Sequence, residues 1–290
     1  MSMPFYVAPE QVMKDRADYA RKGIARGRSL VAGVSADGIV LVAENPSATL
    51  RKISEIYDRI AFAGVGRYNE FDQLRVAGVR HADLKGYSYS REDVDARSLA
   101  NAYAQALGQV FTHEMKPLEV EILVAEVGPD AADDQLFHIL YDGTVIDEPL
   151  RAVLGGDAEA LGERFEADHD PAADAATVLR VAIRALAGPD RTLSAGEIEA
   201  AMLERNGDRR TFRRLTDDEI AAAIDPTDGA SDDADSADPA DAPQADSDSA
   251  DDSEDPATGP EVAGDPADVV DAVLEEPDGD AAGGDGEPAG

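Results

Sequence analysis

Hydrophobic and polar positions follow two different periods along the first part of the chain. In residues 9–26, apolar residues recur three or four positions apart from Met13 to Ile24, among charged neighbours, which predicts an amphipathic helix. SLVAGV and IVLVAE are instead nearly continuous apolar runs on either side of an Asp-Gly turn. Such runs are typical of strands that are covered on both faces, so they predict a hairpin inside a layered fold.

The same two patterns then repeat in a regular order. Strands, a helix pair, more strands and a second helix pair predict two sheets packed face to face with the helix pairs outside, because every apolar face must be covered. The secondary structure of residues 197–205, EIEAAMLER, is left undecided between helix and strand. Their composition favours a helix, while the layered arrangement needs a closing strand. The predicted elements are a second hairpin at 51–57 and 59–66, helices at 67–84 and 97–114, strands at 118–127 and 135–141, and helices at 157–167 and 174–188.

Composition divides the chain at about Asp225. The 290 residues include 61 acidic and 26 basic side chains, a formal net charge of -35, and all the basic ones precede this point. The remainder, rich in Asp, Ala, Pro, Ser and Gly, cannot bury enough apolar area to offset an ordering cost of ~1–2 kcal/mol per residue. Residues 226–290 are therefore predicted to be a disordered acidic tail. Within it, DVVDAVLEE at 268–276 is the one patch apolar enough to dock on another surface.

The rest of the composition narrows the class of protein. The chain has no Cys and only four, widely separated His residues, so we expect no disulfide, metal or other cofactor. Without the tail the net charge is still moderately negative, which disfavours nucleic acid as a partner. No apolar run approaches the ~20 residues that span a bilayer, and the N-terminus lacks the signal-peptide pattern. We therefore expect a cytoplasmic protein with no membrane partner.

Two blocks of sequence carry a family resemblance. YARKGIARGRSLVAGVSADGIVLVAE and LRKISEIYDRIAFAGVGRYNEFDQLR, in their order and spacing, resemble the α-type subunits of the 20S proteasome, and the acidic tail resembles the bacterial, actinobacterial kind. The resemblance implies a four-layer α-β-β-α sandwich of two antiparallel sheets, the N-terminal-nucleophile hydrolase fold. It also implies three parts: a gating segment at 1–8, an α-type domain at 9–225 and the tail at 226–290.

The resemblance raises the question of catalysis at one position. In catalytic relatives, cleavage after a Gly frees a Thr whose hydroxyl attacks the peptide while its amine acts as base. Gly27-Arg28 stands at the matching place, and a guanidinium has no hydroxyl and stays protonated. We therefore expect no catalytic residue, although Glu44 and Lys52 match the supporting acid and lysine. The alternative is a self-processing amidohydrolase cut before Ser29, which would discard the N-terminal helix.

The retained lysine suggests a binding site in place of a catalytic one. In α subunits of this family, the lysine that Lys52 resembles receives the C-terminal carboxylate of an activator, and Gly27 and Gly66 match small residues that line the same pocket. Without the resemblance, a salt bridge from Lys52 to Glu44 or Glu55 is the simpler interpretation.

The resemblance also implies a gate and a set of partners. Residues 1–8 correspond to a gating segment over a central pore, although a frayed terminus is the simpler interpretation. The implied partners are further copies in a heptameric ring, catalytic β subunits, a ring-shaped ATPase acting through its C-terminal tails, and protein substrates carrying a ubiquitin-like tag. A non-enzymatic acidic protein that binds basic partners through its tail is a third hypothesis. The gate residues implied are Phe5, Tyr6, Val7, Pro9 and Tyr19.

Overall fold

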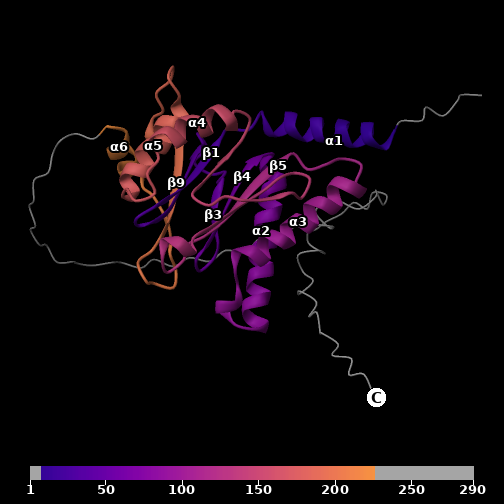
Figure 1. The fold of residues 1–290 in the computed structure, drawn as a ribbon, viewed down its shortest axis with the longest axis horizontal. Helices are drawn as coiled ribbons and strands as arrows, with labels where there is room; N and C mark the ends of the chain where they lie inside the picture. Colours follow the sequence, from indigo (N-terminus) through magenta and orange to yellow (C-terminus); the bar gives the residue numbers. More distant parts are fainter. Residues whose placement is uncertain (1–7, 226–290) are drawn as a thin grey trace, which may run out of the picture.

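Two five-stranded antiparallel sheets lie at the centre of the computed structural model, which describes residues 8–225 (Figure 1). The first sheet has the strand order β10-β9-β2-β1-β8 and the second the order β3-β4-β5-β6-β7. The strands of the first are β1 (Leu30–Ser35), β2 (Gly38–Glu44), β8 (Arg151–Leu154), β9 (Ile198–Glu204) and β10 (Phe212–Arg214). Those of the second are β3 (Ile53–Tyr57), β4 (Ile60–Gly66), β5 (Val120–Glu126), β6 (Gln135–Ile139) and β7 (Val145–Asp147).

Helices cover the outer face of each sheet, which completes four layers (Figure 1). One apolar cluster lies between the second sheet and its helices, another between the first sheet and its helices, and a third between the two sheets. The predicted α-β-β-α sandwich is therefore confirmed. The helices of the second sheet are α2 (Tyr68–Ser88) and α3 (Ala96–His113), and those of the first are α4 (Ala158–Asp168), α5 (Ala175–Ala187) and α6 (Asp217–Ile224).

The continuous apolar runs follow from this layering. In β1, Leu30 and Ala32 belong to the cluster between the sheets, while Val31 packs in the cluster beneath α4 and α5. Successive side chains point to opposite faces of a strand, so a strand covered on both faces needs an apolar residue at nearly every position. The turn into β2 is tight at Gly38, whose φ of 138° favours glycine.

The N-terminal helix α1 (Pro9–Ile24) extends past the edge of the sandwich (Figure 1). Its last turn packs on the body through Ala20, Gly23 and Ile24, which are buried, whereas its first three turns are largely exposed. Pro9 starts the helix, a position where its missing N–H costs nothing. The helix ends two residues before the predicted Arg26, since Ala25 caps it.

The segment at 197–205, undecided between helix and strand from the sequence, forms strand β9. β9 pairs with β2 along its whole length and with β10 on its other side, and both of its faces are buried. Pairing and burial in the middle of a sheet outweigh the helical preference of Ala, Met, Leu and Glu. The short elements β7, β8, β10 and α6 were not predicted as separate elements. Residues 1–7 and 226–290, including the expected gate segment and tail, lie outside the described residues.

Candidate functional site

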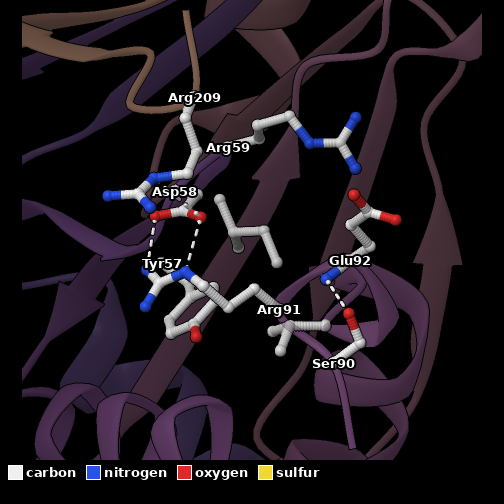
Figure 2. A pocket seen from close by; sticks show the side chains of 9 residues that line it. Tyr57, Asp58, Arg59, Ser90, Arg91, Glu92 and Arg209 are labelled. Atoms are coloured by element: carbon white, nitrogen blue, oxygen red, sulfur yellow. Dashed lines mark hydrogen bonds and ion pairs between the residues drawn. The ribbon is translucent and has the colours of Figure 1, made fainter. Parts of the chain in front are cut away.

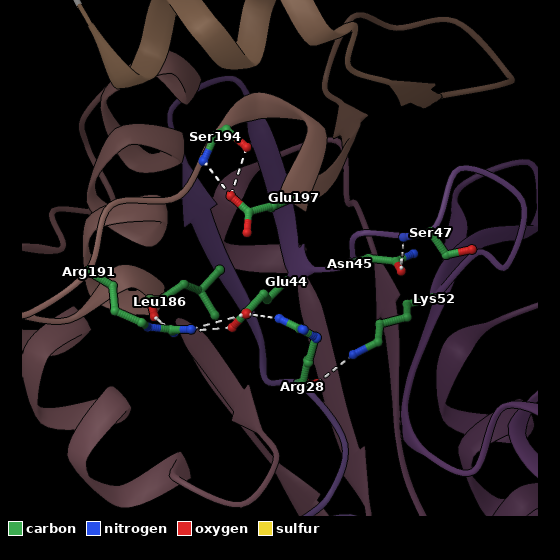
Figure 3. Close-up of polar contacts among 9 residues, drawn as sticks. All are labelled: Arg28, Glu44, Asn45, Ser47, Lys52, Leu186, Arg191, Ser194 and Glu197. Carbon is green, nitrogen blue, oxygen red and sulfur yellow. Dashed lines mark hydrogen bonds and ion pairs between the residues drawn. The ribbon is translucent and has the colours of Figure 1, made fainter.

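Four chain segments meet at one end of the two sheets. The register pairs Leu30 with Ala43 and Ile53 with Ala63, so the start of β1 lies beside the end of β2, and the start of β3 beside the end of β4. This brings together residues that are distant in the sequence. Figure 3 shows Arg28, Glu44 and Lys52 directed toward one another at this end.

Lys52 is the central cation of this site. Its Nζ donates a hydrogen bond to the main-chain carbonyl of Arg28 at 2.5 Å (Figure 3). Its own carbonyl accepts a hydrogen bond from the amide of Gly64 at 3.0 Å. Burial lowers the pKa of Lys52 to about 8, against the opposing effect of the charges on Glu199 and Glu44. The ammonium is thus half-buried and held by a neutral oxygen.

The simpler interpretation of Lys52, a salt bridge to Glu44 or Glu55, is wrong. Within residues 8–225, Lys52 forms no ion pair with either carboxylate, because both are engaged by arginines. Glu55 accepts three hydrogen bonds from Arg210, at 2.6 to 3.0 Å. Glu44 is bound by Arg28 and by Arg191.

Glu44 is buried between two guanidinium groups. Arg28 donates to one carboxylate oxygen, and Arg191 donates to both oxygens at 3.2 Å from the opposite side (Figure 3). The hydrogen bond to Glu44 raises the pKa of Arg191 further. Both carboxylate oxygens of Glu44 therefore accept hydrogen bonds from permanently charged arginines, and Glu44 is not free to act as a base.

Glu199 fixes the backbone that carries Lys52, and sequence reasoning missed it. This buried carboxylate in β9 accepts from the main-chain amides of Lys52 at 2.8 Å and Ile53 at 3.3 Å. It also accepts from the side chains of Asn45 at 2.8 Å and Arg214 at 2.5 Å. The available signal was an acid between the apolar residues Ile198 and Ala200, but residues 197–205 had no assigned element from which to place it.

Gly27 and Gly66 lie against each other beside this cluster. A Cβ on Gly27 would approach the amide nitrogen of Gly66 to 2.9 Å, and a Cβ on Gly66 would overlap the carbonyl of Glu119. Gly66 also has a φ of 114°, a conformation that other residues rarely adopt. Gly27 thus packs against Gly66, and the Nζ of Lys52 reaches the carbonyl of Arg28, the residue after Gly27. A backbone requirement alone explains why Gly66 is a glycine, and a shared activator pocket stays a prediction.

A second cation at this end was not predicted from the sequence. Arg67 directly follows Gly66, and its guanidinium contacts Glu119 at 2.9 Å and Glu70 at 3.6 Å while its side chain remains 54% exposed. Lys116 binds the same two acids. The signal that could have found Arg67 was a cation placed immediately after the glycine that ends a strand.

Of the five expected gate residues, the structure describes only two. Phe5, Tyr6 and Val7 lie outside the described residues. Pro9 is the first residue of α1, and Tyr19 lies on the same helix with 46% of its surface exposed. At 1.5 Å per residue, these two lie about 15 Å apart, so the structure does not bring them together.

A cavity of about 500 Å³ opens beside the arginine pair and is lined by Gly27, Arg28, Ser29, Glu44 and Arg191, among others. The Ser29 hydroxyl makes no hydrogen bond to another described residue, so no base is positioned to activate it. A cut before Ser29 would also remove Ala20 and Ile24 from the core between the sheets. Both observations disfavour the self-processing hydrolase.

A larger cavity, of about 720 Å³, lies at the opposite end of β3 (Figure 2). Arg91 makes two hydrogen bonds to the carboxylate of Asp58, which lower the pKa of this acid, and stacks 4.7 Å from the ring centre of Tyr57. Arg209 lies on the other side of Asp58 at 3.7 Å. Because Asp58 is held ionised between two arginines, it is a poor general acid or base.

Two further findings concern cofactors and membranes. Among residues 8–225, no three His, Asp or Glu side chains are arranged to hold a metal ion. None of the helices in this part of the chain is both long and apolar enough to cross a membrane.

Two antiparallel sheets between two helix layers define a protein with the fold of the N-terminal-nucleophile hydrolases. The chain belongs to the proteasome subunit family, because the family model described as "Proteasome subunit" matches residues 24–203. The predicted family is therefore confirmed.

Individual relatives narrow the resemblance to one type of subunit. The chain is 66% identical over 224 residues to "Proteasome subunit alpha" of Acidimicrobium ferrooxidans, which covers 77% of this chain and 97% of the relative. It is 60% identical over 220 residues to the protein of the same name from Sanguibacter keddieii, covering 74% and 86%. It is 50% identical over 246 residues to that of Actinosynnema mirum, covering 81% and 94%. These identities support the predicted resemblance to a bacterial α subunit.

Proposed function

We propose that this chain is the non-catalytic α subunit of a bacterial 20S proteasome and that seven copies form each outer ring. The observation that carries the proposal is the guanidinium of Arg28 bound to Glu44, at the position where the family resemblance implies the nucleophile. A residue without a hydroxyl, and without a free amine, cannot perform the attack of this class of hydrolase. The catalytic step belongs to β subunits stacked on this ring.

Lys52 is the proposed receptor for an activator. Its half-buried ammonium has one hydrogen-bond acceptor among the described residues, a neutral carbonyl, and its lowered pKa reflects a charge that is poorly compensated. A carboxylate entering this pocket would supply the missing counter-charge in a partly dry environment, where such a contact is strong. The C-terminal carboxylate of a tail from a ring-shaped ATPase has this chemistry, and Gly27 and Gly66, which pack against each other nearby, would form part of the wall of the pocket.

The exposed part of α1 supports assembly into a ring. Val12, Met13 and Tyr19 expose 36%, 38% and 46% of their surfaces along the part of the helix that extends past the sandwich. A neighbouring copy would cover this surface. Residues 1–8, which follow from this helix toward the N-terminus, would then converge near the ring axis and gate substrate entry. In this proposal the complex degrades proteins delivered by the ATPase, including substrates with a ubiquitin-like tag, in the cytoplasm.

A substitution of Lys52 tests the activator site. The Lys52→Ala chain, assembled with catalytic β subunits, is expected to keep its ring and its basal peptide hydrolysis but to lose stimulation by the ATPase. Lys22→Ala, which removes an exposed cation from α1, is the matched control and should leave stimulation intact. Unchanged stimulation with Lys52→Ala would contradict the pocket.

Two simpler measurements test the rest of the proposal. The chain alone should show no peptide hydrolysis, and mass spectrometry should find no cleavage before Ser29. Turnover by the isolated chain, or a new N-terminus at Ser29, would instead establish the self-processing hydrolase.

A further inference from the structure

An apolar pocket lies on the far side of the first sheet from the Lys52 site. It has a volume of about 360 Å³ and is enclosed by α5, α6 and the outer face of strands β2 and β9. Its floor consists of the buried side chains of Val40, Leu179 and Met202, while Leu215 and Ala222 at its rim are partly or largely exposed. A pocket of this size can accept one or two aliphatic side chains.

The pocket also contains a cation, Arg180, that forms no direct ion pair within the described part of the chain; Asp174 is close enough to feel its charge. Arg180 lies on α5, and its Nε is buried without a hydrogen-bond partner among residues 8–225. Arg213, on the other wall, is in contrast paired with Glu204 at 2.5 Å and with Glu219 at 2.7 Å. A complementary ligand would therefore carry an aliphatic group that packs on the floor of the pocket and a carboxylate that binds Arg180.

We propose that residues 268–276 of the same chain, DVVDAVLEE, dock in this pocket. This segment combines the two features that the pocket requires. Its apolar residues are spaced to share one face of a helix, and acidic residues flank them on both sides. The Val and Leu residues beyond Asp225 are Val262, Val269, Val270, Val273 and Leu274, so four of the five lie in this one segment.

The course of the chain favours its own tail over a separate acidic partner. Helix α6 ends at Ile224, and Ala222 and Ala223 in its last turn line the pocket, so the tail begins at the pocket itself. A flexible linker of the length of residues 226–267 spans ~35 Å on average. Such a tether gives an effective concentration of roughly millimolar at the pocket, so a weak contact is sufficient for occupancy.

Disulfide trapping in the full-length chain tests this contact, because the natural sequence has no cysteine. The double variant Ala222→Cys with Val273→Cys places one thiol at the rim and one in the segment. The control pairs Ala222→Cys with Val262→Cys, a tail valine outside the segment. Under mild oxidation, we expect a disulfide within one chain to form at least ~10-fold faster in the first variant than in the control, since docking raises the local thiol concentration.

The same disulfide-trapping assay tests whether the charge of Arg180 contributes to docking. Adding Arg180→Gln to the first double variant should slow trapping at least ~3-fold, whereas Arg184→Gln, an exposed arginine one turn further along α5 that pairs with Asp168, should not. Val270→Asp, a change in the tail that leaves the folded body untouched, should abolish the advantage over the control.

Each remaining outcome overturns part of the proposal. Equal trapping of Val273→Cys and Val262→Cys would show that the segment does not dock. A disulfide between two chains, visible as a doubled mass, would show that the occupant belongs to a neighbouring copy instead. Trapping that is insensitive to Arg180→Gln would remove the charge contact from the explanation.

Discussion

Raising the pH from 7 to 9 is expected to weaken the binding of a C-terminal carboxylate to the proposed Lys52 pocket about tenfold. The form of Lys52 that attracts a carboxylate is the protonated one, and burial lowers its pKa to about 8. The lysine is therefore about nine-tenths charged at pH 7 and about one-tenth charged at pH 9. Binding is therefore strongest below pH 8 and weakens progressively above it.

The size of the effect follows from linkage between protonation and binding. A bound carboxylate raises the pKa of the lysine back toward its ordinary value, so the complex stays protonated at pH 9 while nine-tenths of the free pocket has lost its proton. The dissociation constant then rises by the inverse of the charged fraction, which gives the factor of about ten, or about 1.4 kcal/mol at 25 °C.

Fluorescence anisotropy with a labelled peptide that carries the C-terminal sequence of the ATPase measures this dependence directly. The assembled particle is titrated at several pH values between 7 and 9. The same peptide with an amidated C-terminus is the ligand control, and it should bind weakly at every pH. In the Lys52→Arg particle the guanidinium stays charged, so the pH dependence should disappear even if the affinity differs.

Two results would refute the reasoning. A dissociation constant that stays the same from pH 7 to pH 9 would mean that the charge of Lys52 does not contribute to binding. An equal loss of affinity in the Lys52→Arg particle would assign the titration to another group.

The remaining predictions concern stability. Lys52→Met should raise the free energy of unfolding at pH 7 by about 1 kcal/mol, because it removes a half-buried ammonium that forms no ion pair with a carboxylate of residues 8–225. Since the pKa of Lys52 is lower in the folded chain than in the unfolded one, the wild type gains stability as the pH rises above 8, so this advantage should shrink in urea unfolding at pH 9. Gly78→Ala should cost about 2 kcal/mol, because its Cβ would overlap the buried hydroxyl of Tyr103. Gly162→Ala, a helical position with open space around it, should instead stabilise by up to about 1 kcal/mol, and thermal unfolding compares the two.

The layers of the fold could be predicted because burial on both faces leaves a simple pattern. β1 and β2 are apolar at nearly every position, and this pattern has one main explanation, a strand between two covering layers. β9 could not be assigned in the same way, because Ala, Met, Leu and Glu suit a helix and the strand is specified only by its pairing with β2. The very short strands β7 and β10 carry too few residues for a periodic signal.

The sequence pointed to candidate residues of the site, but it could not predict which side chain or carbonyl each charged group contacts. The family resemblance pointed to Gly27, Lys52 and Gly66; in the structure Gly27 packs against Gly66 and Lys52 contacts the carbonyl of Arg28, while their binding role stays a prediction. The partner of each charge depends on how two hairpins face each other, which no local pattern encodes. Lys52 binds a carbonyl, and Glu44 binds two arginines, because Arg28 and Arg191 reach the acid from opposite sides.

Arg28 links the absence of a nucleophile to the proposed binding function. An acid as close to Lys52 as Glu44 raises the lysine's pKa and would be its natural counter-ion. The guanidinium of Arg28 binds Glu44 instead, with Arg191 on the other side, and at the same time the charge of Arg28 lowers the pKa of Lys52. Lys52 is therefore left with a carbonyl as its partner and can gain from a carboxylate that comes from outside. The contact between Arg28 and Glu44 thus leaves Lys52 without a carboxylate partner among the described residues, and the proposed activator tail would supply one.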